Sequence, residues 1–262
     1  MILQGKIAVI YGATGSVGTA VTIRFAMEGA TVILVARDIV KLKALSDKIC
    51  STGATCSYHV LDATDKKAVD EHLQRVIVEY TRIDISMNLI SISDVQGKPL
   101  SEISFPDFMS PIQTAMHTQF ITSTASAKIM AAQGGGGVIL MLTAQASKLP
   151  YSNTGGFGIA CAAMEALARQ LAKEFGDNGV RVICLRSSGS PDAKGVDEVF
   201  TIHAKNEGIS RKAFEDKFAQ RTMLKRLPLL NEVANTAAIM ASDYSSAITA
   251  TIINLTCGEM AD

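Results

Sequence analysis

The 262-residue sequence lacks several features that define common protein classes. It has no tryptophan, and aromatic residues make up only 5% of it. Its 25 Lys and Arg residues balance 25 Asp and Glu residues, so the basic surface of a nucleic-acid-binding protein is not expected. No apolar run reaches the roughly 18 residues that span a membrane, and the N-terminus has no signal-peptide pattern. We therefore expect a soluble, cytoplasmic protein that binds neither nucleic acid nor membranes.

Cysteine is sparse and scattered. The five residues include no Cys-x-x-Cys pair: Cys50, Cys56, Cys161, Cys184 and Cys257. An odd, dispersed set is typical of reduced thiols, and it favours neither a disulfide framework nor a metal site. We therefore expect no bound metal.

Hydrophobic residues make up 48% of the sequence and fall into a regular pattern. Apolar runs typical of buried strands alternate with helix-length segments. We expect strands at 6–11, 31–36, 56–61, 83–90, 137–143, 180–185 and 250–255, and helices at 16–28, 38–52, 65–80, 105–132, 156–176 and 231–242. This alternation predicts an α/β fold with a single doubly wound parallel sheet, a Rossmann fold with helices on both faces, in one domain over 1–262.

One segment interrupts the alternation. Between residues 190 and 228 the charge density rises and no strand is evident, and 196–225 is typical of one or two helices. The segment follows the sixth strand, and ligands of open α/β sheets bind outside the carboxyl ends of the strands. We therefore interpret 190–228 as a substrate lid, the alternative being a surface helical pair without a role.

A glycine-rich turn, 12–18, follows the first strand and opens the first helix. Gly12, Gly15 and Gly18 let backbone N–H groups approach a pyrophosphate at the N-terminus of the helix. The spacing alone is a weak signal, but the strand before it and the helix after it strengthen it. The turn predicts a dinucleotide-binding site.

The residues after the second and third strands bear on the choice of dinucleotide. An acidic residue at the end of the second strand would bind ribose hydroxyls and repel a 2′-phosphate, but this chain has Ala36 and then Arg37. A guanidinium suits a phosphate, so we expect NADP(H) in preference to NAD(H). The alternative is that Arg37 is a solvated residue at a helix start. Asp62 is placed either to contact the adenine or, with Thr64 as the other candidate, to cap the next helix.

These motifs resemble those of the short-chain dehydrogenase/reductase family along nearly the whole chain. The resemblance is carried by Gly5-Lys6-Ile7-Ala8-Val9 before the turn, Leu61-Asp62-Ala63-Thr64-Asp65, Leu171-Ala172-Lys173-Glu174-Phe175 and Gly179-Val180-Arg181-Val182. It implies an oligomer, a dimer or tetramer (in this family commonly a homotetramer), formed through helices 105–132 and 156–176. It also implies cofactor contacts from Gly12, Thr14, Gly15, Ser16, Val17, Gly18, Arg37, Asp62, Ala63, Asn88, Leu89 and Gly189.

The chain departs from the family pattern where the chemistry takes place. Ser16 replaces the middle glycine of the turn, and only the first Asn of the family's Asn-Asn-Ala-Gly motif remains, as Asn88. The family's Asn, Ser, Tyr and Lys tetrad falls on Ala115, Ala144, Phe157 and Cys161, and no tyrosine in the chain has a lysine four residues later. Substitutes near the expected site are Tyr151, Lys148 and Thr143, each with the alternative of a substrate-shaping, solvated or structural role.

Carbonyl reduction needs a proton as well as a hydride, and Phe157 cannot donate one. The resemblance and its departures together predict an atypical NADP(H)-dependent oxidoreductase acting on an activated small molecule of iminium or enone type, or a non-redox cyclase-like enzyme. The alternative is a catalytically silent nucleotide-binding protein or a partner subunit of an active homologue.

Overall fold

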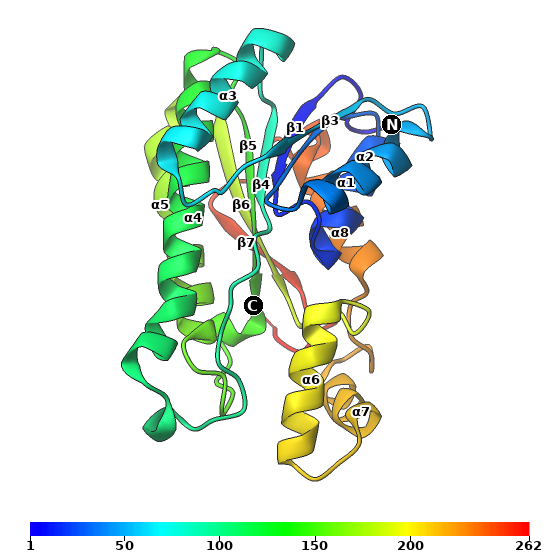
Figure 1. Ribbon diagram of the computed structural model, residues 1–262, viewed down its shortest axis with the longest axis vertical. Helices are drawn as coiled ribbons and strands as arrows, with labels where there is room; N and C mark the ends of the chain where they lie inside the picture. Colours follow the sequence, from blue (N-terminus) through cyan, green and yellow to red (C-terminus); the bar gives the residue numbers. More distant parts are fainter. Residues whose placement is uncertain (262) are drawn as a thin grey trace.

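A computed structural model describes residues 1–261, which form one sheet between two layers of helices (Figure 1). The seven parallel strands lie in the order β3-β2-β1-β4-β5-β6-β7. Their bounds are β1 Ile7–Tyr11, β2 Thr31–Ala36, β3 Cys56–Val60, β4 Ile85–Asn88, β5 Gly137–Ala144, β6 Val180–Ser187 and β7 Thr251–Leu255.

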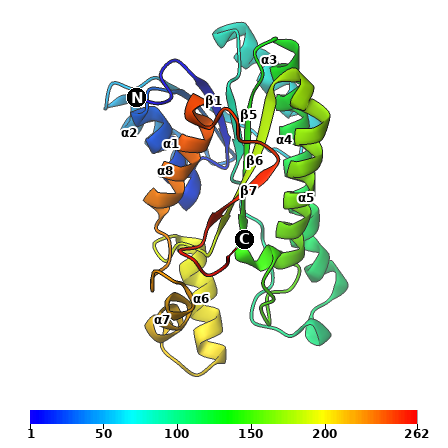
Figure 2. The same cartoon turned by 180° about the vertical axis from the view of Figure 1, so that it is seen from behind.

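Helices cover both faces of the sheet (Figures 1 and 2). One layer contains α1 (Ser16–Met27), α2 (Ile39–Cys50) and α8 (Leu230–Ala241), and the other contains α3 (Lys66–Tyr80), α4 (Phe105–Ala132) and α5 (Phe157–Phe175). Side chains alternate across the strands, so Ala8 and Ile10 enter one apolar core while Val9 and Tyr11 enter the other. Burial of both faces explains why the central strands read as continuous apolar runs. The expected parallel Rossmann-type sheet is confirmed.

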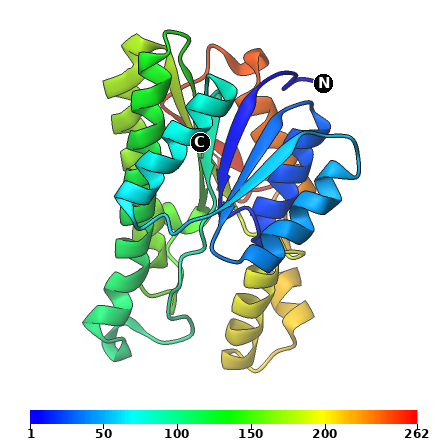
Figure 3. The same ribbon diagram turned by 45° about the horizontal axis from the view of Figure 1, so that its top comes forward.

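The strand order reverses between β1 and β4, where a crevice is expected in doubly wound sheets. Tyr11 lies beside Asn88 in the register of these two strands, so the loops that follow them begin side by side. Figure 3 shows the α4–α5 layer and the α1–α2 layer diverging on either side of this point. The glycine-rich turn, the loop after β4 and the loops after β5 and β6 therefore converge at one end of the sheet.

Two further helices, α6 (Lys194–Asn206) and α7 (Arg211–Arg221), extend beyond that end of the sheet (Figure 1). They have an apolar core of their own, formed around Phe200, Ala204, Phe214 and Leu227. The helical character expected for 196–225 is therefore correct, and the segment divides into two helices around Gly208. Among residues 1–261, none of the helices has the length and apolar character needed to span a bilayer.

Candidate functional site

The glycine-rich turn is closely packed at two of its three glycines. Gly12 has a φ of 72°, and a Cβ there would lie 2.6 Å from the backbone of Leu89. A Cβ at Gly18 would lie 2.2 Å from the carbonyl oxygen of Gly12. These two positions require glycine so that the turn can fold against β4 and against itself.

Gly15 instead leaves the start of α1 accessible. It is the N-cap residue and provides no side-chain cap, and the nearest atom to a Cβ there is the Gly12 carbonyl oxygen, 3.4 Å away. The N–H groups of the first helical turn, at Ser16, Val17 and Gly18, have no partners within the helix. Uncapped N–H groups at a helix N-terminus suit a diphosphate, so the turn fits the dinucleotide expected from the sequence.

Ser16, which replaces the family's middle glycine, points toward the helical pair. Its hydroxyl accepts a 3.2 Å hydrogen bond from the N–H of Lys194, the first residue of α6. The glycine-rich turn and the α6–α7 segment are therefore in direct contact. The family pattern gives no indication of this contact, because glycine at this position has no side chain.

Arg37 lies exposed immediately after β2, as expected from the sequence. The next residue, Asp38, is the N-cap of α2, and its carboxylate accepts 3.1 Å hydrogen bonds from the N–H groups of Val40 and Lys41. The acidic group nearest the end of β2 is thus occupied in capping the helix. Its bonds to the backbone of Lys41, with the nearby Lys41 charge, hold the pKa of Asp38 below its usual value.

Asp62 forms a local turn rather than a helix cap. Its carboxylate accepts hydrogen bonds from the N–H (3.0 Å) and the hydroxyl (2.8 Å) of Thr64, which lower the pKa of Asp62. The charge of Arg37 lowers it further, so the two side chains share one electrostatic environment. The N-cap of α3 is Asp65, so the alternative that Asp62 or Thr64 caps this helix is wrong. Ala63 between them is buried.

Asn88 and Leu89 connect the end of β4 to the turn and to α4. The Asn88 amide donates a 3.0 Å bond to the hydroxyl of Thr122, and its oxygen accepts one from the N–H of Ile90. The backbone of Leu89 is the surface that excludes a Cβ at Gly12. Asn88 is therefore a structural link between strand and helix, and Leu89 shapes the turn.

The four tetrad positions lie together in one small apolar cluster. Ala115 on α4, Ala144 at the end of β5, and Phe157 and Cys161 on α5 are packed with Ala160 and Met164. Ala115 and Cys161 are only 2% and 1% exposed. Burial raises the pKa of the Cys161 thiol to about 12, so this thiol is neither an acid nor a nucleophile at neutral pH. The side chains at the four positions that the resemblance assigns to the tetrad therefore form a continuous hydrophobic cluster.

A buried ion pair lies directly behind this cluster. Glu165, one helical turn after Cys161, forms two hydrogen bonds of 2.8 and 2.6 Å with the guanidinium of Arg186 on β6. The hydroxyls of Thr143 and Ser147 also donate to the Glu165 carboxylate. Burial tends to raise the pKa of Glu165, but these donors, with the charge of Arg186, outweigh it and hold the pKa below its usual value. Thr143 is thus part of this ion-pair network.

Tyr151 is fixed at the rim of the site by three parts of the chain. Its hydroxyl donates a 2.7 Å hydrogen bond to Glu259, and its ring is stacked on Phe218 of α7 with centroids 5.7 Å apart. The hydroxyl of Ser188 donates a 2.6 Å bond to the other oxygen of Glu259. Burial and the Glu259 carboxylate raise the pKa of Tyr151, which makes it a weaker acid than a free tyrosine. Lys148, on the same loop, is exposed.

Two buried polar atoms at the carboxyl ends of β5 and β6 have no partner within residues 1–261. They are the amide oxygen of Gln145 and the hydroxyl oxygen of Ser187. The amide nitrogen of Gln145 donates a 3.3 Å bond to the carbonyl of Ser188, which places Gln145 beside this strand end. Gly189 follows with a φ of 84°. Unpaired polar atoms here match the donors and acceptors of a nicotinamide carboxamide, so this end of the site also fits the cofactor.

Asp94 lies on the loop after β4 that packs against the apolar cluster. Ile92 of this loop packs against the cluster, and Gln96 donates a hydrogen bond to the Asp94 carboxylate. Burial raises the pKa of Asp94, and the Asp94 charge in turn contributes to the raised pKa of Cys161. A half-buried carboxylate therefore lies on a loop that packs against the apolar cluster, and the sequence pattern alone did not indicate it.

The α6–α7 segment is fastened to the same loop. The ring Nε2 of His203 lies 2.8 Å from the amide oxygen of Gln96, and the Asn206 amide donates a 2.7 Å bond to the carbonyl of Gly97. Together with the bond from Lys194 to Ser16, these contacts bridge the site between the diphosphate turn and the loop after β4. The carboxylate of Asp192, just before α6, accepts hydrogen bonds from the N–H of Leu230 at the start of α8.

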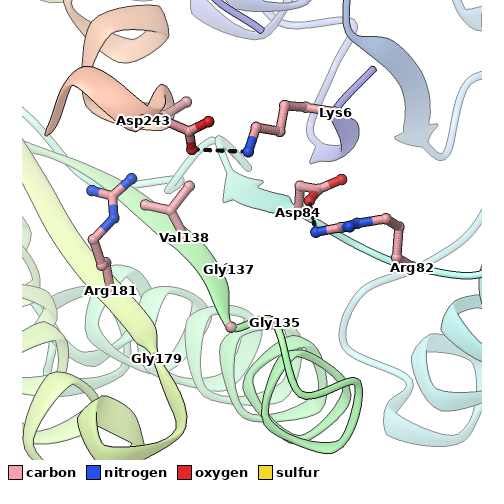
Figure 4. A pocket seen from close by; sticks show the side chains of 11 residues that line it. Lys6, Arg82, Asp84, Gly135, Gly137, Val138, Gly179, Arg181 and Asp243 are labelled. Atoms are coloured by element: carbon pink, nitrogen blue, oxygen red, sulfur yellow. Dashed lines mark hydrogen bonds and ion pairs between the residues drawn. The ribbon is translucent and has the colours of Figure 1, made fainter. Parts of the chain in front are cut away.

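Two pockets differ in their place relative to the converging loops. One, of about 110 Å³, is at the opposite end of the sheet, where Lys6 pairs with Asp243 and Arg82 with Asp84 (Figure 4). The third basic side chain of the lining, Arg181, donates to the backbone carbonyls of Met240, Ser242 and Ile248, so we assign this pocket a structural role. The second, of about 290 Å³, is lined by Pro99, Leu100 and residues 151–155 and adjoins the Tyr151 rim. Its position makes it an approach to the candidate site. Among residues 1–261 there is no metal-binding group of three or more His, Cys, Asp or Glu side chains.

Comparisons with known proteins agree with this arrangement. The family model described as enoyl-(acyl carrier protein) reductase matches residues 12–259. The chain is 28% identical to the 3-oxoacyl-(acyl-carrier-protein) reductase FabG of Thermotoga maritima over 98% of this chain and 99% of the relative. It is 26% identical to an uncharacterized oxidoreductase of the same organism over the full length of both.

Among solved structures, an NAD⁺-bound xylitol dehydrogenase superposes with a TM-score of 0.90 at 20% identity, covering 97% of this chain and 99% of that one. At this identity the likeness supports the fold alone. The family model covers the diphosphate turn, all six sheet-covering helices and the rim residue Glu259. The parallel sheet, the uncapped turn and this match together show the family. The chain belongs to the short-chain dehydrogenase/reductase family, whose members bind a nicotinamide cofactor.

Proposed function

We propose that this protein is an NADP(H)-dependent oxidoreductase whose substrate is an electrophile that needs no proton from the enzyme, with an iminium ion as the favoured class. The apolar cluster at the tetrad positions carries this proposal. Hydride addition to a ketone forms an alkoxide, and loss of the acid that protonates it costs about 10²–10⁴-fold in rate. Hydride addition to an iminium ion forms a neutral amine, and no proton is required.

The cofactor part of the proposal rests on both ends of the site. The uncapped N–H groups of α1 would hold the diphosphate, and Arg37 would pair with a 2′-phosphate, because the competing Asp38 carboxylate is engaged with the α2 backbone. Gln145 and Ser187 would bond the carboxamide through their unpaired oxygens. When bound, the reduced nicotinamide supplies the hydride. Every other contribution comes from positioning by the chain.

Asp94 supports an iminium ion over an enone. A cation bound against the apolar cluster would be stabilised by the nearby carboxylate, and the Asp94 pKa would fall back as its charge is compensated. An enone would become an enolate anion on hydride addition, and the same carboxylate would repel it. The sign of the charge at Asp94 therefore separates the two classes of activated substrate.

We infer that residues 190–228 act as a lid over this site. The bonds from Lys194 to Ser16, from His203 to Gln96 and from Asn206 to Gly97 hold α6 across the converging loops. Closure of this kind excludes water, which strengthens the attraction between Asp94 and a bound cation.

We also infer an oligomer built on α4 and α5. Phe120 and Ile159, on these two helices, are 54% and 49% exposed, although both are large apolar residues. Helix packing between copies would cover them. Light scattering on the purified protein tests this, and a monomer at micromolar concentration would contradict it.

The deciding experiment combines nucleotide titration with single-turnover kinetics. Calorimetry with NADPH and with NADH comes first. If the protein binds neither nucleotide, the cofactor assignment is wrong. The NADPH complex is then mixed with a cyclic iminium ion, an enone and a ketone. We expect turnover of the iminium ion and slow or absent turnover of the ketone. Rapid ketone reduction would contradict the proposal. If NADPH binds tightly, none of the three compounds is turned over and an intact homologue co-purifies, the result would instead favour a silent partner subunit.

The variant Asp94→Asn tests the choice of substrate class, with Glu102→Gln as a control that removes an exposed negative charge nearby. We expect Asp94→Asn to slow iminium reduction by at least ~10-fold, which corresponds to about 1.4 kcal/mol, and to leave enone reduction unchanged or faster. Equal effects of the two variants would show that Asp94 makes no specific contact with the substrate.

A further inference from the structure

Two cysteine side chains far from the candidate site lie almost in bonding contact. The Sγ atom of Cys50, the last residue of α2, is 2.7 Å from the Sγ atom of Cys56, the first residue of β3. An S–S bond is about 2 Å long, so a small side-chain movement would join these two atoms. Proximity of this kind is not implied by the sequence, where the two cysteines are six positions apart in a dispersed set.

The surroundings hold the two thiols in this arrangement. The side chain of Cys56 packs against the apolar core beneath α2, and its sulfur also lies 3.3 Å from the hydroxyl of Ser46, one helical turn before Cys50. Cys50 is exposed and Cys56 is half-buried. One sulfur is therefore open to a soluble oxidant while the other is held next to it.

We propose that Cys50 and Cys56 are a redox modification site that forms an intramolecular disulfide when the protein meets a hydroperoxide. The hydroperoxide oxidises the exposed Cys50 sulfur to a sulfenic acid, and its O–O bond breaks to release water or an alcohol. The Cys56 sulfur then attacks Cys50 Sγ, the S–O bond breaks, and a second oxygen leaves as water. Together the two thiols lose two protons and two electrons, and one hydroperoxide is reduced.

The raised pKa of Cys56 fits its role as the thiol that attacks the sulfenic acid at Cys50. Burial and the neighbouring Cys50 raise the pKa of the Cys56 thiol to about 11, so it is a poor nucleophile toward a hydroperoxide in solution. It reacts only with a partner already within contact distance, which is a sulfenic acid at Cys50. Oxidation thus begins at the exposed residue and ends in the disulfide.

The disulfide would fasten an edge of the sheet. Within residues 1–261, β3 is the edge strand of the sheet and pairs only with β2, so one side of it is unpaired. A covalent link from its first residue to the end of α2 would hold the edge strand against its covering helix and close the loop 51–55. This site is independent of the nucleotide and the hydride-transfer chemistry.

The test is a count of free thiols before and after oxidation of the full chain. Fully reduced protein is freed of reductant, treated with stoichiometric hydrogen peroxide, denatured and alkylated. We expect the number of free thiols to fall from five to three, with the loss of two hydrogen masses in the peptide carrying both cysteines, and dithiothreitol to restore all five. A count that stays at five, or a covalent dimer on a non-reducing gel in place of the internal link, would overturn the proposal.

Matched variants identify the partners. Cys50→Ser should keep all four of its remaining thiols, and Cys56→Ser should stop at a sulfenic acid at Cys50, detected with dimedone. Cys257→Ser removes a half-buried cysteine that has no thiol neighbour among residues 1–261, and it should fall from four thiols to two. Loss of thiols from Cys50→Ser to the same extent as from the wild type would assign the oxidation to another pair.

Discussion

Tyr151 and Glu259, 108 positions apart in the sequence, are joined by a 2.7 Å hydrogen bond at the rim of the candidate site. The hydroxyl donates its proton to a carboxylate on the C-terminal segment, and Phe218 of the proposed lid stacks on the ring. The only tyrosine in the loop before α5 is therefore occupied in joining three segments. This relationship argues that the lost family acid at Phe157 has not been replaced by a neighbour.

Tyr151→Phe tests this directly. If Tyr151 is structural, single-turnover hydride transfer should change by less than about 3-fold, because the variant removes one hydrogen bond, and unfolding should cost roughly 1 kcal/mol less. If Tyr151 were the acid, the rate should fall by about 10²–10⁴-fold. Stopped-flow nicotinamide absorbance and urea unfolding measure the two quantities. Tyr244→Phe, at a residue that is 85% exposed, is the control.

Arg37→Ala should weaken the binding of NADPH without affecting the binding of NADH. A charged hydrogen bond to the 2′-phosphate contributes about 1.5–3 kcal/mol, so the NADPH dissociation constant should rise by roughly 10- to 100-fold. Lys48→Ala, the control, removes an exposed charge in the last turn of α2 and should leave the affinities for both nucleotides unchanged. Equal loss of affinity for NADPH and NADH in calorimetry would refute the assignment of Arg37 to the 2′-phosphate.

Glu165→Gln should destabilise the fold by about 3–5 kcal/mol, because the buried Arg186 would lose its carboxylate partner. The native pKa of Glu165 is below its ordinary value of 4.5, so the stabilisation is complete above that pH and is lost as pH falls through the native pKa. The stability gap between wild type and variant should therefore be constant at neutral pH and narrow below about pH 4.5. Urea unfolding between pH 7 and 3.5 measures it, with the exposed Glu174→Gln as control.

His72→Leu should reduce the acid sensitivity of the protein. His72 is fully buried on α3, and burial, with the charges of His59 and Arg75, lowers its pKa from 6.5 to about 3. Between these values the unfolded chain binds a proton that the native state does not, so native stability falls as pH drops below 6.5. From pH 7 to 5.5 the wild type should lose about 1 kcal/mol more than the variant. An unchanged pH slope in urea unfolding, as expected for the exposed control Gln74→Leu, would contradict this role of His72.

The elements of the fold were accessible to sequence reasoning because their signals are local. Continuous apolar runs such as Ile7–Tyr11 require burial on both faces, and glycines such as Gly12 end strands where the chain must turn sharply. The strand expected at 83–90 is shorter in the structure, where β4 spans Ile85–Asn88. Ile83 and Ile90 on either side of it pack in the core, and an apolar run does not distinguish a core residue outside the strand from one within it.

The sequence by itself determined the parallel sheet and the glycine-rich turn, because each depends on residue identity at a short, fixed spacing. Only the tertiary structure decided which side chains meet: the apolar cluster around Ala115 and Cys161, the Glu165–Arg186 pair behind it, and, elsewhere, the two sulfurs of Cys50 and Cys56. These contacts join segments that are far apart in the chain or lie on different elements. Their geometry follows from how helices pack on the sheet, and no local pattern of residues encodes it.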